Sequence, residues 1–174
     1  MTLRCGILVV CLAVSVPALA QTKEQPRLGV GLSMIPSSND FGLGFGAGVL
    51  LPIKDSKAGS IGVLGAGGFQ HTAHFNTDEF GGGARLTHGL TPKARVFLQG
   101  TISVVQRRDH KADDPFAHTR TDPAYSGGAG VSLSATERLN VVIEGDLGML
   151  NEKTHNTKVG LLFFGVSLPI GHRT

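Results

Sequence analysis

The chain has 174 residues, 41% of them hydrophobic, with 25 Gly and a formal net charge of +3 at pH 7. So small a charge gives no indication of a nucleic-acid partner, and the length suits a single domain. Both cysteines, Cys5 and Cys11, lie near the N-terminus, so a chain that loses this segment has no disulfide or thiolate chemistry.

The first twenty residues have the pattern of a secretory signal peptide. A short head carries Arg4, an apolar stretch runs over residues 7–16, and the small-residue sequence Ala18-Leu19-Ala20 follows. This order predicts cleavage after Ala20. The apolar stretch is too short for an anchoring helix, because a helix needs about 20 apolar residues to cross a bilayer. We therefore expect residues 1–20 to be a signal peptide and residues 21–174 to form one mature domain.

The mature domain shows period-two alternation of apolar residues with small or polar ones, and almost no helical periodicity. This pattern predicts an all-β fold of consecutive antiparallel strands. No segment after residue 20 is long and apolar enough for a transmembrane helix, so any membrane insertion would use strands. The eight predicted strands are, in chain order, 28–34, 41–51, 60–70, 77–87, 95–104, 123–134, 139–149 and 157–168.

The connections between these strands are expected to alternate in length. Such an alternation is typical of outer-membrane barrels, which have short turns at one rim and longer polar loops at the other. The compact turns are predicted at 52–59, 88–92 and 135–138, and the longer loops at 36–40, 71–76, 107–122 and 151–156.

The second predicted strand indicates which face of the sheet points outward. Phe41, Leu43 and Phe45 alternate with glycines, so one face is apolar and the other almost bare. A soluble barrel would turn the apolar face inward, but a bare, water-facing strand surface would be weakened by its glycines without any gain. Inside a narrow eight-stranded barrel the same glycines make room. We therefore expect the apolar face to contact lipid, and the exposure of these three side chains distinguishes the two alternatives.

The interior face carries polar residues of nearly balanced charge, and buried charges persist only when they are paired. We expect Arg85 or Arg95 to contact Glu79, Glu144 or Asp146 inside the barrel. The last strand, 157–168, is apolar on both faces, so alternation leaves its orientation open. The predicted interior polar network consists of Glu79, Arg85, Arg95, Gln99, Asn140, Glu144 and Asp146.

The Gly-rich alternation over residues 41–49 and the terminal run 158–168 resemble the small outer-membrane β-barrels. This family includes the outer-membrane protein A transmembrane domain, the outer-membrane protein X type and the opacity proteins. The resemblance implies an eight-stranded up-and-down transmembrane barrel in the cell outer membrane. It also implies contact with membrane lipid and lipopolysaccharide, and assembly with the help of periplasmic chaperones and the barrel-assembly machinery.

The motifs of catalysis and cofactor binding are weak. The Gly-rich stretches continue as strand rather than opening a helix, so they do not form a nucleotide-binding loop. No Gly-x-Ser-x-Gly elbow occurs, and no histidine is followed two residues later by Ser, as in the lipid A deacylase type. We expect no cofactor and no metal site. The residues that could supply a loose Zn or Cu site are the predicted loop histidines His71, His74, His110, His118 and His155.

These observations favour a non-enzymatic, monomeric outer-membrane barrel with a role in membrane integrity or in adhesion through its outer loops. The mixed charges of residues 107–122 motivate the surface role. We expect the interior of an eight-stranded barrel to be filled by side chains, so that it does not conduct as a porin does. Two alternatives stay open: a soluble periplasmic barrel that binds an apolar ligand, and an outer-membrane enzyme that modifies lipid A.

Overall fold

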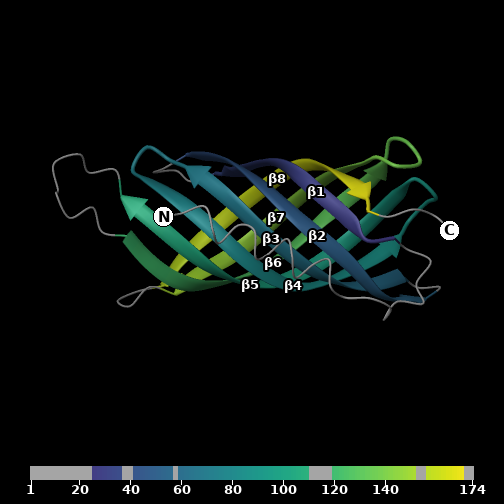
Figure 1. Ribbon diagram of the computed structural model, residues 1–174, viewed down its shortest axis with the longest axis horizontal. Coiled ribbons are helices and arrows are strands. Elements are labelled where there is room, and N and C mark those ends of the chain that lie inside the picture. Colours follow the sequence, from purple (N-terminus) through teal and green to yellow (C-terminus); the bar gives the residue numbers. More distant parts are fainter. Residues whose placement is uncertain (1–24, 37–40, 57–58, 110–118, 152–155, 171–174) are drawn as a thin grey trace.

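The computed structural model describes residues 25–36, 41–56, 59–109, 119–151 and 156–170. In this part of the chain eight strands form a closed barrel (Figure 1), as the sequence predicted. No helix among the described residues is long and apolar enough to span a bilayer. The proposed signal peptide, residues 1–20, lies outside the described residues. The strands are β1 (Arg27–Ile35), β2 (Gly42–Ser56), β3 (Gly59–His71), β4 (Phe75–Gly89), β5 (Ala94–Asp109), β6 (Thr119–Ser134), β7 (Asn140–Asn151) and β8 (Asn156–Pro169).

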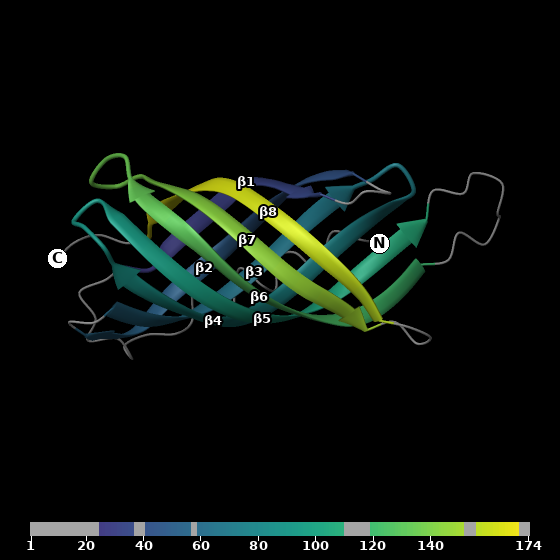
Figure 2. The same ribbon diagram turned by 180° about the vertical axis from the view of Figure 1, so that it is seen from behind.

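The barrel closes by pairing of its first and last strands. Each strand pairs antiparallel with the next one in the sequence, and β8 returns to pair with β1. The closing register runs from Arg27 opposite Pro169 to Met34 opposite Leu162. Figures 1 and 2 both show β8 in yellow beside β1 in purple. Closure gives every strand two hydrogen-bonding neighbours, which is the condition for placing a sheet in hydrocarbon.

The apolar face of the strands points outward. Phe41, Leu43 and Phe45 are 56%, 54% and 61% exposed, and Leu147 reaches 78%. Each of the eight strands contributes large apolar side chains to this exposed surface, which we call the apolar belt. A continuous belt of this kind around a closed barrel is a lipid-facing surface. The orientation is the opposite of that expected for the soluble-barrel alternative.

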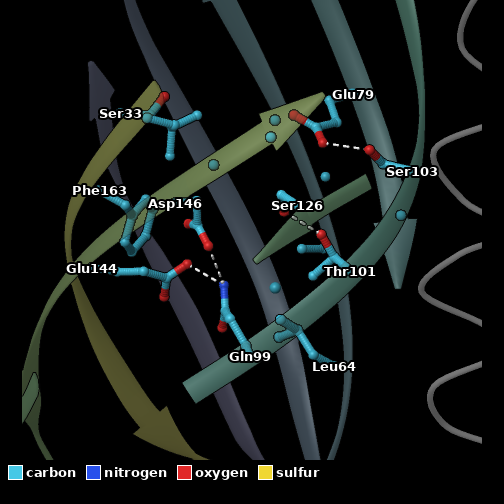
Figure 3. A pocket seen from close by; sticks show the side chains of 18 of the residues that line it. Ser33, Leu64, Glu79, Gln99, Thr101, Ser103, Ser126, Glu144, Asp146 and Phe163 are labelled. Atoms are coloured by element: carbon cyan, nitrogen blue, oxygen red, sulfur yellow. Dashed lines mark hydrogen bonds between the residues drawn. The ribbon is translucent and has the colours of Figure 1, made fainter. Parts of the chain in front are cut away.

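The orientation of β8, which alternation left open, follows from its pairing. Leu162 and Phe164 are 37% and 44% exposed and belong to the apolar belt. Phe163, which lies between them, pairs with Ser33 of β1, and Ser33 is a buried interior residue. Phe163 therefore faces the interior, where Figure 3 shows its ring.

The turn predicted at 52–59 is shorter than expected, because β2 continues beyond Pro52. The strand runs to Ser56, and its pairing with β3 shifts register between Pro52 and Lys54. Such an irregularity accommodates a proline, which has no N–H to donate to the ladder. Gly59 then starts β3 with a φ of 146°, a conformation that favours glycine. The hairpin between β2 and β3 is therefore longer and its turn shorter than predicted.

The connection predicted at 71–76 is present but shorter, because a threonine closes a tight turn between His71 and Phe75. Thr72 Oγ1 accepts hydrogen bonds from the backbone N–H groups of His74 and Phe75, at 3.2 and 3.1 Å. Thr91 and Thr136 close the β4–β5 and β6–β7 turns in the same way. Serine and threonine hydroxyls commonly stabilise turns by such bonds. The difference in length between the two rims is therefore smaller than expected.

The charged segment 107–122 is partly strand. β5 extends to Asp109 and β6 begins at Thr119, so Arg107 and Arg108 lie in the sheet rather than in a solvated loop. Their cross-strand partners are Arg120 and Thr119. At this end of the barrel the paired strands β5 and β6 continue beyond the apolar residues and carry charged side chains.

Candidate functional site in the barrel interior

Four of the predicted interior residues form one hydrogen-bonded group, here called the central cluster: Arg85, Gln99, Glu144 and Asp146. Arg85 Nη2 lies 2.9 Å from Glu144 Oε2, and Arg85 Nε donates to Gln99 Oε1 at 2.9 Å. The Gln99 amide nitrogen donates to Glu144 Oε1 and, at 3.2 Å, to Asp146 Oδ1 (Figure 3). The structure thus brings one arginine and two carboxylates together inside the barrel.

The ion pair in the central cluster is shielded from water. The side chains of Arg85 and Glu144 are only 13% and 11% exposed. Charges in such surroundings are stable only while each has its partner and its remaining hydrogen bonds are satisfied. Gln99 supplies those bonds, because its amide accepts from the guanidinium and donates to both carboxylates. The cluster therefore acts as one unit rather than as separate pairs.

Strand β6 lies between Arg85 and Gln99 on one side and the carboxylates of β7 on the other. Its glycines let these side chains meet across it. In the sheet Gln99 is opposite Gly128, which is opposite Asp146. A Cβ atom on Gly128 would come within 2.6 Å of Asp146 Cγ. Gly130 lies beside Phe97 in the same way, and its Cβ would come within 2.9 Å of a ring carbon. These interior glycines therefore make room for larger neighbours.

Phe97 covers one face of the Arg85 guanidinium group. The guanidinium carbon lies 3.9 Å from the ring centroid, and Phe97 is 3% exposed. A cation over an aromatic face contributes about 2 kcal/mol when both are desolvated. Phe97 was not predicted from the sequence as an interior residue, although it shares the alternation of Arg95 and Gln99. That alternation was the signal that could have placed it inside.

The other three predicted interior residues make contacts elsewhere in the barrel. Glu79 Oε1 accepts a hydrogen bond from Ser103 Oγ at 2.6 Å. Asn140 Nδ2 donates to Ser132 Oγ at 3.1 Å. Arg95 lines the interior near the start of β5. Among the contacts expected between an interior arginine and a carboxylate, the structure shows that of Arg85 with Glu144.

Phe163 was not assigned from the sequence, and glycines surround its ring. Cβ atoms on Gly31 and Gly165 would each come within 2.7 Å of ring carbons, so a side chain at either position would displace the ring. A Cβ on Gly46 would lie 3.5 Å from it, in ordinary contact. Glycines of β1, β2 and β8 thus form a cradle for one interior aromatic side chain.

The histidines considered as metal ligands are only partly described. His110, His118 and His155 lie outside the described residues. His71 ends β3, and its Nδ1 atom is 2.6 Å from Asn76 Oδ1, while His74 lies in the following turn. Within the described ranges, no group of three His, Cys, Asp or Glu residues is arranged to hold a metal ion.

The barrel interior contains a cavity of about 690 Å³. The central cluster borders it, together with Thr101 and Ser126, whose hydroxyl oxygens are 2.6 Å apart (Figure 3). The expectation that side chains fill the interior is therefore wrong. Glycine, alanine and serine occupy many interior positions, and their side chains are too small to close the space. A cavity of this size falls within the range of small-molecule sites.

Solved structures with the same arrangement of strands are bacterial outer-membrane barrels. The N-terminal β-barrel domain of Pseudomonas aeruginosa OprF matches with a TM-score of 0.64 at 15% identity, over 83% of this chain and 97% of that one. Ail, the attachment invasion locus protein of Yersinia pestis, matches with a TM-score of 0.57 at 11% identity, over 83% and 98%. The outer-membrane enzyme PagL matches with a TM-score of 0.57 at 12% identity, over 82% and 99%.

The protein has the fold of the small outer-membrane β-barrels. The resemblance inferred from the sequence is confirmed at this level, whereas its opacity-protein part stays a prediction. The shared fold and the apolar belt support the outer membrane as the location of this barrel. No family model matches the sequence, and no curated protein matches it as a relative. Because the neighbours include both an attachment protein and an enzyme, the fold alone does not assign an activity.

Proposed function

We propose that the protein is a non-enzymatic, integral outer-membrane barrel that makes contacts at the cell surface through the charged ends of β4, β5 and β6. The observation that carries this proposal is a change of residue type along the outward face of β5. Ile102 and Val104 are 69% and 51% exposed and apolar, and the next outward positions are Gln106 and Arg108. The change marks the border at which the barrel leaves hydrocarbon.

The same change occurs on the neighbouring strands. On β4 the outward position of Phe80 is followed, toward the same rim, by Asp78 and Asn76. On β6 Tyr125 is exposed, and Thr121 and Thr119 lie beyond it. Three adjacent strands therefore extend past the apolar belt as a polar sheet. Surface contacts of outer-membrane barrels depend on such projecting parts, because the belt itself is covered by lipid.

Charged residues on this projecting sheet form pairs, and we call them the charged collar: Asp78, Arg107, Arg108, Asp109, Arg120 and Asp122. Arg108 Nη2 lies 3.0 Å from Asp78 Oδ2, and Arg107 Nε lies 3.0 Å from Asp109 Oδ1. A looser pair joins Arg120 to Asp122 at 3.7 Å. The outward-facing pair of Arg108 and Asp78 gives this sheet a surface of mixed charge, which suits both the phosphates of lipopolysaccharide and a protein or glycan on another cell. Ail, which shares the fold, is an attachment protein by its name.

The distribution of the apolar belt supports a monomer. Every strand contributes exposed apolar side chains, so lipid is expected around the whole circumference. The expected partners are then outer-membrane lipid and lipopolysaccharide, with chaperones and the barrel-assembly machinery acting during insertion. Chemical cross-linking in membranes should leave the protein at the mass of one chain.

Attachment of cells tests the surface role. Cells that produce the protein should adhere to a host-cell layer more than cells of the same strain that lack it. The double substitution Asp78→Ala and Arg108→Ala should reduce this adherence, because it removes the outward-facing pair of the charged collar. Lys93→Ala, in the turn at the opposite end, is the matched control and should leave adherence unchanged. Equal adherence of producing and non-producing cells would contradict the proposal.

A further inference from the structure

The two ends of the barrel differ in how their cationic side chains are paired. At one end, each arginine of the charged collar forms an ion pair with an aspartate. The exposed cations described at the other end, which we call the basic rim, are Lys54, Lys93 and Arg138. In the part of the chain that the structure describes, none of these three forms an ion pair, and the exposed carboxylate beside them is Glu137. The basic rim is therefore open to an anion from outside the protein.

Two cations of the basic rim lie in neighbouring turns that touch each other. Ser134 N donates a hydrogen bond to the Lys93 carbonyl oxygen at 2.8 Å, so the β6–β7 turn packs against the β4–β5 turn. Figures 1 and 2 show both turns at the end of the barrel where β8 ends. Thr91 Oγ1 and Thr136 Oγ1 accept hydrogen bonds from the backbone N–H groups of Lys93 and Arg138, each at 3.3 Å. The two cations therefore occupy the same position in two turns of the same kind.

The apolar belt continues up to these two turns. Leu133 is exposed and lies opposite Ala94, the residue that follows Lys93. Val141, which lies opposite Leu133, is exposed as well, and so is Leu90 in the β4–β5 turn. Short turns of outer-membrane barrels face the periplasm, so the belt meets water here at the periplasmic leaflet. Lysine and arginine at such a border keep their charged groups at the headgroup level while their stems cover apolar surface.

This surface combines two properties that one kind of molecule matches. The cations of the turns attract a negative group, and the apolar side chains next to them lie against hydrocarbon chains. A soluble anion would bind the cations but would gain nothing from the apolar side chains. An anionic phospholipid satisfies both, and each lysine or arginine near an anionic lipid surface contributes about a fivefold preference at low salt. Glu137 opposes part of this attraction, so we expect the pair of cations to give about a fivefold preference in total.

We propose that Lys93 and Arg138 form a headgroup site for an anionic phospholipid of the periplasmic leaflet, whose acyl chains lie along Leu133 and Val141. The site fixes the depth at which this end of the barrel lies in the membrane. It rests on the proposed membrane barrel but is independent of the surface role, because the charged collar lies at the opposite end.

Fluorescence quenching by brominated lipids tests the site. The chain has no Trp, so an introduced Trp reports on the lipid beside it. Leu133→Trp lies next to the two turns, and Val104→Trp lies on the apolar belt near the charged collar. The protein purified from membranes is placed in vesicles of phosphatidylcholine and phosphatidylglycerol, with bromine on the acyl chains of one lipid or the other. Phosphatidylglycerol should be preferred about fivefold at Leu133→Trp, and the two lipids should bind about equally at Val104→Trp.

Substitutions of the cations test the assignment. In the Leu133→Trp protein, Lys93→Gln and Arg138→Gln should each lower the preference for phosphatidylglycerol, and together they should abolish it. Arg138→Lys keeps the charge and should keep most of the preference. Lys54→Gln is the matched control, because it removes a cation of the same rim from β2, whose neighbours in the sheet are β1 and β3. It should leave the preference at Leu133→Trp unchanged.

The outcomes that would overturn the site are distinct from a failure of the membrane barrel. Each variant is first required to show the β-sheet circular dichroism and the heat-dependent gel mobility of the wild type. Brominated phosphatidylcholine should quench both tryptophans, and a lack of quenching at both would contradict the barrel itself. With quenching present, an equal preference at both tryptophans, or one that persists without Lys93 and Arg138, rejects the site. Loss of the preference on adding inorganic phosphate, but not chloride of equal ionic strength, would show a site for a free anion and also rejects it.

Discussion

Gly128 and Asp146 are cross-strand partners, and a methyl group on Gly128 would overlap the Asp146 carboxylate. The carboxylate occupies the space that a side chain on β6 would fill, and from there it accepts a hydrogen bond from Gln99, on the far side of β6. One missing side chain therefore allows a polar cluster to span four strands, from β4 to β7. Because Gly128 and Asp146 are so close, one methyl group added at residue 128 would displace the Asp146 carboxylate and disturb the central cluster.

Gly128→Ala should destabilise the barrel by about 1–3 kcal/mol, because an added methyl group in a packed interior forces its neighbours out of place. Gly127→Ala is the matched control. Gly127 faces outward, and its Cβ would be 3.9 Å from the nearest atom, the Gln99 carbonyl oxygen, so its effect should stay within about 1 kcal/mol. Urea unfolding in lipid vesicles, followed by circular dichroism because the chain has no Trp, measures both. A larger loss for Gly127→Ala would contradict the interior position of Gly128.

Arg85→Met should be among the most destabilising single changes in the protein. It leaves Glu144 and Asp146 without their cation, and breaking a buried ion pair costs about 3–5 kcal/mol. Adding Glu144→Gln to Arg85→Met should recover part of this loss, because the cluster then holds one unpaired carboxylate fewer. Arg108→Met breaks an exposed pair with Asp78 and should change stability by about 1 kcal/mol or less. Additive effects of the two cluster substitutions would show that Arg85 and Glu144 do not act as one unit.

Adjacent phenylalanines of β8 should respond differently to truncation. Phe163→Ala empties the glycine cradle in the interior, and losses for buried Phe→Ala changes are about 3–5 kcal/mol. Phe164→Ala removes a side chain that is 44% exposed on the apolar belt, where lipid refills the space, so its effect should be smaller. The free energy of unfolding of the two variants, measured under identical conditions, decides the orientation of β8. Equal effects, or the reverse order, would require a different register with β1.

Spin labels should distinguish the lipid face from the interior. Leu147→Cys, at the most exposed apolar side chain named above, should place a nitroxide in hydrocarbon and make its relaxation sensitive to molecular oxygen. Ser126→Cys lies inside, hydrogen-bonded to Thr101 in the wild type, and a label there should be shielded from lipid-dissolved oxygen. Equal oxygen sensitivity at both sites would contradict the transmembrane barrel.

We expect the protein to have no enzymatic activity toward lipid A. The measurement separates this expectation from the enzyme alternative, since one protein with the same fold, PagL, is an outer-membrane enzyme. Lipid A from cells that produce the protein should have the same mass spectrum as lipid A from cells that do not. Loss or gain of an acyl chain in producing cells only would show an enzyme and replace the surface role. An inactive Arg85→Met variant in that case would not locate the active site, because its fold is expected to be weakened.

Residues 41–51 show how much of the fold could be predicted from the sequence alone. Their alternation of large apolar side chains with glycines predicted both the strand and the face that meets lipid, and Leu43 and Phe45 are exposed as expected. His71 shows the opposite case, whereas His74 lies in a turn as predicted. Loop positions were inferred for them from local polarity, but His71 ends a strand, because Thr72 closes a tight turn immediately after it.

The number of strands, the inward and outward faces of the first seven strands and the polar residues of the interior were determined by the sequence itself. Side chains of a strand alternate with a period of two, which is a local property that neighbouring residues reveal. Only the tertiary structure decided the orientation of β8, the cavity and the partners within the central cluster. Arg85 and Glu144 are 59 positions apart, and their contact depends on the register of four strands and on the glycines between them. Such a register is a property of the closed ring and cannot be read from any single segment.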